Sequence, residues 1–297
     1  MKLSIGMDAI EKVGVIGQGI IGSRVAERLR ESGRHVYVWN RTPRPIPNFL
    51  GSPAEMAQLA DVVQIFVANG EALVEVVEAM RPELTKRHTV VNNCTADPES
   101  VVAAYELAKD AGAAFLDAPF TGSKLAAEKG ALVYYIGGDP DALERVRGVL
   151  EASAKELLLV GRVGEASVIK IATNMISAAT VEVLAEAYGL VSAAGIEPEK
   201  LAEAVEHNAC GSALTAMKLP AMIQRDYETH FSLKHMFKDA QYALKLGKEL
   251  KVDLPALSTT ASVMFRAIQK GLGEKDYSVL AEKFQSAQSE GGTEPKS

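Results

Sequence analysis

The sequence predicts an α/β Rossmann-type dinucleotide-binding domain followed by an all-α domain, with a long helix linking the two. Three observations favour this fold class. Short apolar runs alternate with helical patterns over residues 13–160, which is typical of βαβ units and a parallel sheet. A glycine-rich loop follows the first apolar run directly, and strand-like runs stop after Gly164. We therefore expect domains at residues 12–164 and 165–285, and a disordered tail at 286–297.

Seven apolar runs have the length of strands and are expected to form the sheet: 13–16, 35–39, 62–67, 89–92, 114–117, 132–136 and 156–160. Helical patterns lie between them at 20–32, 52–60, 71–80, 98–111 and 140–150. Several begin at a proline or a small polar residue, as the order Ser52, Pro53 and Glu55 illustrates. Beyond the break at 161–164, we expect helices at 165–194, 198–207, 234–250 and 257–271.

Length and composition limit the class of protein. A chain of 297 residues allows about two domains. Hydrophobic residues make up 47% and charged residues 24%, which excludes a disordered or disulfide-stapled chain. The net charge of −6 argues against non-specific nucleic-acid binding, so a local positive site must hold any anionic ligand.

The sequence also favours a cytoplasmic location. Cys94 and Cys210 match no metal or redox spacing, and the histidines show no metal-binding pattern, so no metal site is expected. No leader peptide is visible. The apolar stretch 166–181 is interrupted by Lys170 and is too short to span a bilayer, so we expect no membrane span. The Lys86-Arg87-His88 cluster is interpreted as a solvated helix end. Cys94 is interpreted as a buried structural thiol, and a redox sensor is the alternative.

The first motif is a GxGxxG directly after the first strand, at the start of a helix. Its first glycine allows a tight turn, its second lets the backbone approach a pyrophosphate, and its third lets the helix pack on the strand. Backbone amides of the helix N-terminus would then face the phosphates. The alternative is a glycine turn without a ligand. The residues of this loop are Gly17, Gln18, Gly19, Ile20, Ile21 and Gly22.

The end of the second strand favours NADP(H) over NAD(H). NAD-binding folds place an acidic residue there to hold the ribose 2′-hydroxyl, whereas this chain has Asn40, Arg41 and Thr42. No carboxylate repels a 2′-phosphate, and Arg41 can bind it through a charge-assisted fork. The alternative is a solvated loop arginine. Prolines within 43–47 predict that the following crossover helix is shortened.

Lys170 is the second candidate site. It is the sole charged residue between Glu165 and Glu182 in an apolar helix, and Asn174 lies four residues on, on the same face. Burying an ammonium is costly, so such a lysine either extends to solvent as a structural residue or lines a polar cleft, and composition alone leaves both open. In a cleft, partial desolvation would suit a lysine to proton donation near neutral pH. Lys170 could then protonate an alkoxide formed by hydride transfer.

A third candidate follows the fifth strand, at the edge where open α/β sheets bind ligands. The turn Thr121-Gly122-Ser123 offers hydroxyls and amides that can anchor a small carboxylate. An ordinary Ser/Thr turn is the alternative.

Together these motifs resemble the β-hydroxyacid dehydrogenase family, 3-hydroxyisobutyrate dehydrogenase type, over residues 12–285. The ordered motifs are GVIGQGIIG with WNRT, NNCTADPES, DAPFTGSKLAAEKGAL, GRVGEASVIKIATN and FSLKHMFKDAQYAL. The stretch TGSKLAAEKG is most similar to the glyoxylate/succinic semialdehyde reductase branch.

The resemblance implies a role for each matching position. Lys170 would be the catalytic acid/base and Asn174 its helper. The implied substrate-binding residues are Thr121, Gly122, Ser123 and Asp239. Besides the glycine loop and residues 40–42, the implied cofactor-binding residues are Val67, Ala68, Asn69, Thr95 and Lys238. The family fold also implies a homodimer or homotetramer formed through the helical domain.

Three departures bear on the substrate. Thr121 stands where the family usually has serine, Cys94 precedes Thr95 where serine is usual, and Asn69 stands where an acidic residue is common. We expect an NADPH-dependent, reversible reductase of a small carboxylate-bearing aldehyde. Imine reductase is the first alternative, although its relatives commonly replace the lysine with Asp or Tyr. A non-catalytic interaction module is the second, and the lysine argues against it.

Overall fold

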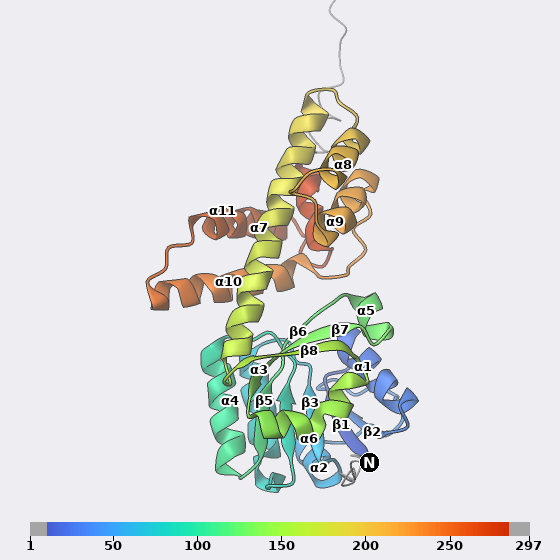
Figure 1. Ribbon diagram of the computed structural model, residues 1–297, viewed down its shortest axis with the longest axis vertical. Helices are drawn as coiled ribbons and strands as arrows, with labels where there is room; N and C mark the ends of the chain where they lie inside the picture. Colours follow the sequence, from blue (N-terminus) through green and yellow to red (C-terminus); the bar gives the residue numbers. More distant parts are fainter. Residues whose placement is uncertain (1–10, 285–297) are drawn as a thin grey trace, which may run out of the picture. The chain divides into compact units, whose positions relative to one another are not determined.

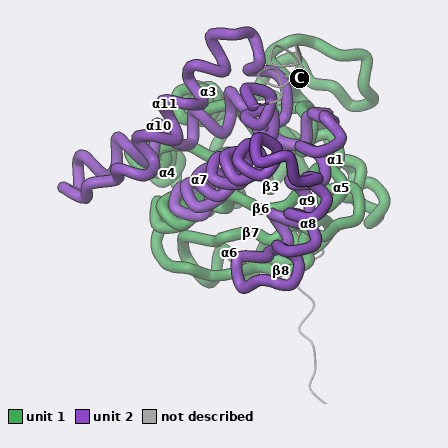
Figure 2. The backbone as a smooth tube through the Cα atoms, turned by 90° about the horizontal axis from the view of Figure 1, so that it is seen from above, with its two compact units in different colours: residues 1–170 green, residues 171–297 purple. Residues whose placement is uncertain are grey.

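The computed structural model describes residues 11–284, so the predicted tail at 286–297 lies outside the described residues. The chain divides into two compact units between Lys170 and Ile171 (Figure 2). The division falls inside a long helix, a turn and a half beyond Gly164, where the sequence changes character. Each unit is described below by itself.

Unit 1 alternates strands and helices, and the seven predicted strands and five predicted helices of this part are confirmed within a few residues (Figure 1). Its strands are β1 (Lys12–Ile16), β2 (His35–Trp39), β3 (Val62–Ile65), β4 (Thr89–Asn92), β5 (Ala114–Asp117), β6 (Phe120–Thr121), β7 (Leu132–Gly138) and β8 (Ala154–Gly161). Its helices are α1 (Ile20–Glu31), α2 (Pro53–Leu59), α3 (Gly70–Met80), η1 (Arg81–Glu83), α4 (Pro98–Asp110), α5 (Lys124–Glu128) and α6 (Pro140–Glu151). The sequence missed β6 and α5 because two and five residues are too few to show a period.

The strands form one sheet in the order β2-β1-β3-β4-β5-β7-β6, with β8 paired to β7. β1 to β5 are parallel, as expected. The expectation of a parallel sheet throughout was wrong beyond β5, because β7 runs antiparallel to β5 and to β6. The connection from β5 to β7 holds only β6 and α5, which is not the full crossover helix that a parallel return requires. The order reverses at β1, so the carboxyl ends of β1 and β3 flank a switch point where such sheets bind ligands.

Alternate residues of the strands bury opposite faces of the sheet. Val13 and Val15 of β1 face a cluster that also contains residues of α1 and α6. Ile16 and Ile65 face a second cluster with residues of α2, α3 and α4. Because helices cover both faces, the strands are apolar on both sides, and this produces the continuous apolar runs seen in the sequence.

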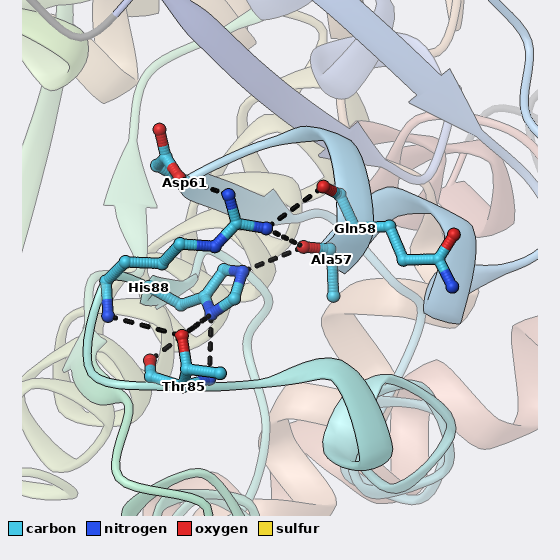
Figure 3. Close-up of polar contacts among 6 residues, drawn as sticks. Ala57, Gln58, Asp61, Thr85 and His88 are labelled. Carbon is cyan, nitrogen blue, oxygen red and sulfur yellow. Dashed lines mark hydrogen bonds and ion pairs between the residues drawn. The ribbon is translucent and has the colours of Figure 1, made fainter.

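The cluster Lys86-Arg87-His88 was predicted to be a solvated helix end; Lys86 and Arg87 are exposed as expected, but no helix ends there and the interpretation was wrong for His88 (Figure 3). His88 is fully buried, and its Nε2 lies 2.8 Å from the carbonyl oxygen of Ala57. Arg87 donates to the carbonyls of Ala57 and Gln58 at 3.0 and 2.9 Å and pairs with Asp61 at 3.1 Å. The last carbonyls of a helix have no partner within it, and the loop before β4 supplies partners for those of α2.

Unit 2 is helical and contains most of α7 (Glu165–Ala193), then α8 (Pro198–Glu206), α9 (Ala213–Gln224), α10 (Leu233–Leu250), α11 (Pro255–Gln269) and η2 (Tyr277–Ala281). Four of these helices confirm the sequence prediction. The sequence missed α9, which carries Pro220 in its interior and begins with a capping box between Ser212 and Thr215. The buried side chains of unit 2 form one cluster that includes Ile171, Met222 and Leu280.

A buried ion pair joins α9 to η2 inside unit 2. Lys218 Nζ lies 2.7 Å from Asp276 Oδ1 and 4.4 Å from the centroid of the Tyr277 ring. Asp276 also accepts hydrogen bonds from the amides of His230, Phe231 and Ser278. Both charged side chains are buried, so each supplies the compensation that the other needs.

By length and composition, α7 is the one helix of residues 11–284 that could cross a membrane. The core helix of a soluble protein passes the same test, and 44% of the apolar window of α7 is buried inside the protein. This is weak evidence for a membrane span.

Candidate functional site

The glycine loop is held by the end of β2. The Gly17 amide donates to the Trp39 carbonyl at 2.8 Å, and the Gln18 amide donates to Asn40 Oδ1 at 3.1 Å. The Asn40 side chain in turn donates to the Thr42 carbonyl at 2.9 Å. Asn40, the first residue after β2, thus fixes the loop by a side-chain contact.

The three glycines meet different surroundings. Gly17 has a φ of +94°, and a Cβ there would lie 2.1 Å from the Phe66 carbonyl oxygen. A Cβ on Gly22 would lie 2.0 Å from the Gly17 carbonyl oxygen, whereas a Cβ on Gly19 would meet nothing within 4 Å. Packing within the protein therefore explains the first and third glycines but leaves the second unexplained. Open space at Gly19 fits a loop that a pyrophosphate approaches.

The first turn of α1 has no side-chain cap and no acidic residue. By contrast, α2 to α6 each have a side-chain cap, provided by Ser52, Asn69, Asp97, Ser123 and Asp139. Uncapped amides at a helix start are donors for an anion, and the helix dipole adds to the attraction. The glycine loop and α1 together fit the phosphates of a dinucleotide.

Two arginines border this loop. Arg41 is exposed directly after Asn40, and Arg44 donates from Nη1 to the Gln18 carbonyl at 2.7 Å. Between the end of β2 at Trp39 and the start of α2 at Pro53 the chain forms no helix, and α2 has only seven residues, so the prediction of a shortened crossover helix is confirmed. Sequence reasoning missed Arg44, although its position among the three prolines was a signal that this loop is constrained.

The next predicted cofactor residues lie at the same edge of the sheet, because the parallel strands β3 and β4 end there. Val67, Ala68 and Asn69 follow β3, and Asn69 caps α3 by accepting from the Ala72 amide at 2.9 Å. Thr95 follows β4 and is half-buried. The structure therefore brings these positions to the edge that carries the glycine loop.

The predicted carboxylate anchor runs from Thr121, the last residue of β6, to Ser123, the residue before α5. Thr121 and Gly122 are exposed, and Gly122 has a φ of +137° that favours glycine. Ser123 Oγ accepts from the Ala126 amide at 3.3 Å and caps α5. The hydroxyl of Ser123 therefore has a structural use, and its proton is still available as a donor to an anion.

Asp117, at the end of β5, is a buried carboxylate that sequence reasoning did not single out. It accepts from the side chains of Asn92 and Ser167 and from the amides of Gly164 and Ser167, at distances of 2.9 to 3.2 Å. Burial raises the pKa of Asp117 to about 6, although these donors act in the opposite direction. The donors Gly164 and Ser167 belong to the start of α7, about fifty residues away in the sequence, so no local pattern could reveal the contact.

Lys170 lies on the second turn of α7, and its residue is 9% exposed. It is therefore not a lysine that extends into bulk solvent. Asn174 follows one helical turn later and is 8% exposed. The predicted catalytic pair thus occupies one face of a regular helix, as the spacing indicated.

Inside unit 2, Asp239 connects two of the predicted residues. Its Oδ2 accepts from the Asn174 side chain at 2.6 Å, and its Oδ1 lies 3.1 Å from Lys238 Nζ. Lys238 also lies over the Tyr242 ring, 4.8 Å from its centroid. Asp239 is 1% exposed, so in this structure it positions Asn174 and Lys238. Within residues 11–284, no group of three potential metal ligands occurs.

Comparison with protein families finds two matches that cover almost the whole chain. The NAD binding domain of 6-phosphogluconate dehydrogenase matches residues 12–161. The NAD-binding domain of NADP-dependent 3-hydroxyisobutyrate dehydrogenase matches residues 164–284.

Two individual proteins are similar in sequence to most of this chain. Glyoxylate/succinic semialdehyde reductase 2 of Arabidopsis thaliana, a chloroplastic protein, is 30% identical over 93% of this chain and 80% of its own length. The cytokine-like nuclear factor N-PAC of Anopheles gambiae is 29% identical, but the chain spans only 49% of it.

Two solved structures show the same fold. The 3-hydroxyisobutyrate dehydrogenase of Mycobacterium tuberculosis, solved with L-serine, has a TM-score of 0.84 at 21% identity and covers 93% of this chain and 99% of its own. An imine reductase from a Pseudomonas species has a TM-score of 0.60 at 17% identity and covers 93% of this chain and 99% of its own.

Proposed function

The chain belongs to the β-hydroxyacid dehydrogenase family of the 3-hydroxyisobutyrate dehydrogenase type, and we propose that it is an NADPH-dependent reductase of small carboxylate-bearing aldehydes. The substrates would be of the glyoxylate and succinic semialdehyde class, and the reaction would be reversible. One observation carries the proposal. Lys170 is a nearly buried lysine on an otherwise apolar helix, one turn before an asparagine that a buried carboxylate holds in place.

The chemistry follows from these side chains. A bound reduced nicotinamide supplies the hydride to the aldehyde carbon. The Lys170 ammonium donates its proton to the aldehyde oxygen, so that a hydride and a proton convert the aldehyde to an alcohol. Asn174, held by Asp239, orients the lysine or the substrate oxygen. The hydroxyls and amides of Thr121, Gly122 and Ser123 would bind the substrate carboxylate.

The preference for NADPH is supported by the rim of the glycine loop. No carboxylate occupies the end of β2, and Arg41 is exposed beside Asn40. Arg44 is held against the loop by the Gln18 carbonyl. We expect Arg41→Ala to weaken NADPH binding at least tenfold and to change NADH binding little, because only NADPH carries the 2′-phosphate. Cofactor titrations with both nucleotides measure this, and an equal loss for both would contradict it.

A substrate panel tests the reaction itself. Small oxo-acids and semialdehydes are assayed with NADPH and with NADH, and consumption of NADPH with glyoxylate or succinic semialdehyde is the expected result. Cyclic imines belong in the same panel, because an imine reductase shares this fold. Turnover of imines without aldehydes would favour that alternative. NADPH binding without turnover of any compound would favour a non-catalytic interaction module.

The Gly19→Ala variant should bind NADPH at least tenfold more weakly and keep the thermal stability of the wild type. The new methyl group meets no protein atom, but it occupies the space that the pyrophosphate needs. Gly22→Ala should instead lower the melting temperature, because its methyl group overlaps the Gly17 carbonyl. Gly148→Ala, inside α6, is the matched control: it should leave NADPH binding unchanged and should not lower the melting temperature, because alanine favours a helix interior over glycine. Undisturbed NADPH binding by Gly19→Ala would place the phosphates elsewhere.

We also propose that the protein self-associates through α7. Ile169, Ile176, Val183 and Leu190 are spaced by seven residues and are 40% to 74% exposed, so they form one apolar stripe along the helix. A stripe of this kind is typical of a surface that another helix covers. Light scattering should give the mass of a dimer or tetramer at micromolar concentration, and Val183→Glu should lower it; a monomeric wild type would refute the proposal.

A further inference from the structure

The start of α7 is capped by the sheet rather than by its own sequence. Gly164 precedes the helix and has no side chain that could cap it. The Glu165 carboxylate does not cap the helix either, because it accepts hydrogen bonds from the Arg162 amide and guanidinium. The amides of Gly164 and Ser167 instead donate to Asp117 Oδ2, at 3.2 and 2.9 Å. Five other helices of unit 1 have a cap from the residue that precedes them, so α7 differs in drawing its cap from a distant strand.

The second carboxylate oxygen of Asp117, Oδ1, is also held by hydrogen bonds. Asn92, at the end of β4, donates to Asp117 Oδ1 at 3.1 Å, and Asn92 Oδ1 accepts from the Cys94 amide at 3.0 Å. Ser167 Oγ donates to the same Oδ1 at 2.9 Å. The carboxylate therefore has four donors, and it connects the ends of two strands to the first turn of one helix. All of these atoms are buried, which makes each contact worth more than it would be in water.

We propose that Asp117 is a positioning residue for catalysis: by capping α7 from the sheet, its carboxylate fixes the first turn of the helix and, with it, the direction in which Lys170 extends. Ser167, which supplies two of the four donors, precedes Lys170 by three residues and therefore lies beside it on the helix. A rotation or fraying of this turn moves the ammonium group from the reacting oxygen, and small displacements of a catalytic group are costly in rate. This inference rests on the role proposed above for Lys170.

Protonation of Asp117 offers a way to test this arrangement. All four donors are N–H or O–H groups, so they match the ionised carboxylate, and a protonated oxygen would face a donor. The groups that act on the pKa of Asp117 are neutral: Asn92 from β4, Gly164 directly before α7, and Ser167 from α7. The nearest titratable groups along these elements are the Cys94 thiol, which donates to Asn92 Oδ1, Glu165 and Arg162, which pair with each other, and Lys170.

The test measures kcat for glyoxylate reduction between pH 5 and pH 8 from initial rates at saturating NADPH. In this direction Lys170 acts in its protonated form and gives no loss of rate at low pH. Wild type should therefore lose about tenfold in kcat between pH 7 and pH 5, as Asp117 gains its proton. Asp117→Asn should have a kcat at least tenfold lower at pH 7, no further fall at low pH, and an unchanged Kd for NADPH. Asp139→Asn, which alters the cap of α6, is the matched control and should behave as wild type.

Ser167→Ala gives a second route if Asp117→Asn does not fold. It removes one donor that lowers the pKa of Asp117, so the low-pH fall in kcat should move to higher pH. A wild-type kcat and pH profile in Asp117→Asn, or an unmoved profile in Ser167→Ala, would overturn the proposal.

Hydrogen exchange separates this inference from the proposed function. The amides of residues 165–170 should exchange faster in Asp117→Asn than in wild type or Asp139→Asn. If wild type reduces no aldehyde, the proposed function fails, whereas faster exchange in Asp117→Asn still supports the anchoring of α7. Equal exchange in all three proteins overturns the anchoring.

Discussion

Replacing Lys170 with alanine should lower kcat for aldehyde reduction by about 10²- to 10⁴-fold, which is the range that a general acid contributes. The Kd for NADPH should change less than about twofold, because the glycine loop and its arginines are untouched. KM should change less than kcat, since the proton is transferred only in the transition state. Stopped-flow or steady-state NADPH oxidation measures the rate, and fluorescence titration measures cofactor binding.

Two further variants define what the Lys170 result means. Lys170→Arg keeps a positive charge but donates its proton poorly, so it should stay close to alanine in rate if proton transfer is the role. Lys155→Ala removes an exposed lysine from the same unit and should leave kcat unchanged. A Lys170→Ala variant that keeps more than a tenth of the wild-type rate would show that this lysine is not the general acid.

Lys218→Met should destabilise the helical unit by about 3 to 5 kcal/mol, because it leaves Asp276 buried without its counter-charge. For a unit of this size the loss corresponds to a fall of about 10 °C or more in melting temperature. Circular dichroism of the full chain measures it. The hydrogen bonds from the amides of residues 230, 231 and 278 remain, but they do not replace a cation.

The pH dependence of this loss has a defined sign. Burial alone would raise the pKa of Asp276, but Lys218 and the surrounding donors lower it below its ordinary value. The stabilisation from the pair is therefore present above the ordinary aspartate pKa and disappears as the pH falls through the lower folded-state value. The gap between wild type and Lys218→Met should consequently be largest at neutral pH and shrink in acid.

An exposed ion pair supplies the comparison for Lys218. Lys234 lies 2.6 Å from Glu274 on the surface of the same unit, and Lys234→Met should cost less than about 1 kcal/mol. The double variant Lys218→Met/Asp276→Leu should regain part of the loss, since no buried charge is then left alone. If Lys218→Met and Lys234→Met melt at the same temperature, burial does not make this pair important.

Local patterns predicted most of the fold. The strands 35–39, 89–92 and 114–117 were predicted to the residue, because buried parallel strands are apolar runs bounded by turn residues. The errors have physical causes. Helix α9 was not predicted because it contains Pro220, and a proline inside a helix is normally unfavourable. The antiparallel return to β7 depends on a short connection whose elements were too small to recognise.

The candidate site likewise has features that the sequence predicts and contacts that it does not. The glycine loop and the pair Lys170 and Asn174 are local spacings, and the sequence displays them directly. The contacts of Asp117 with Ser167 and of Asn174 with Asp239 join residues fifty and sixty-five positions apart. His88 was predicted to be solvated because its sequence neighbours are basic. Its ring is in fact buried and contacts the carbonyl of Ala57, thirty-one residues earlier. Such contacts depend on how the elements pack, and one sequence does not reveal them.

The strand end that holds the glycine loop also carries the chain's sole tryptophan, Trp39, whose carbonyl accepts from Gly17. Indole emission overlaps the absorption band of a reduced nicotinamide. Because the residue that carries the indole contacts the loop through its backbone carbonyl, binding of a reduced nicotinamide nucleotide at that loop should be detectable as energy transfer in the unlabelled protein. The protein therefore contains an intrinsic fluorescent probe of nucleotide binding.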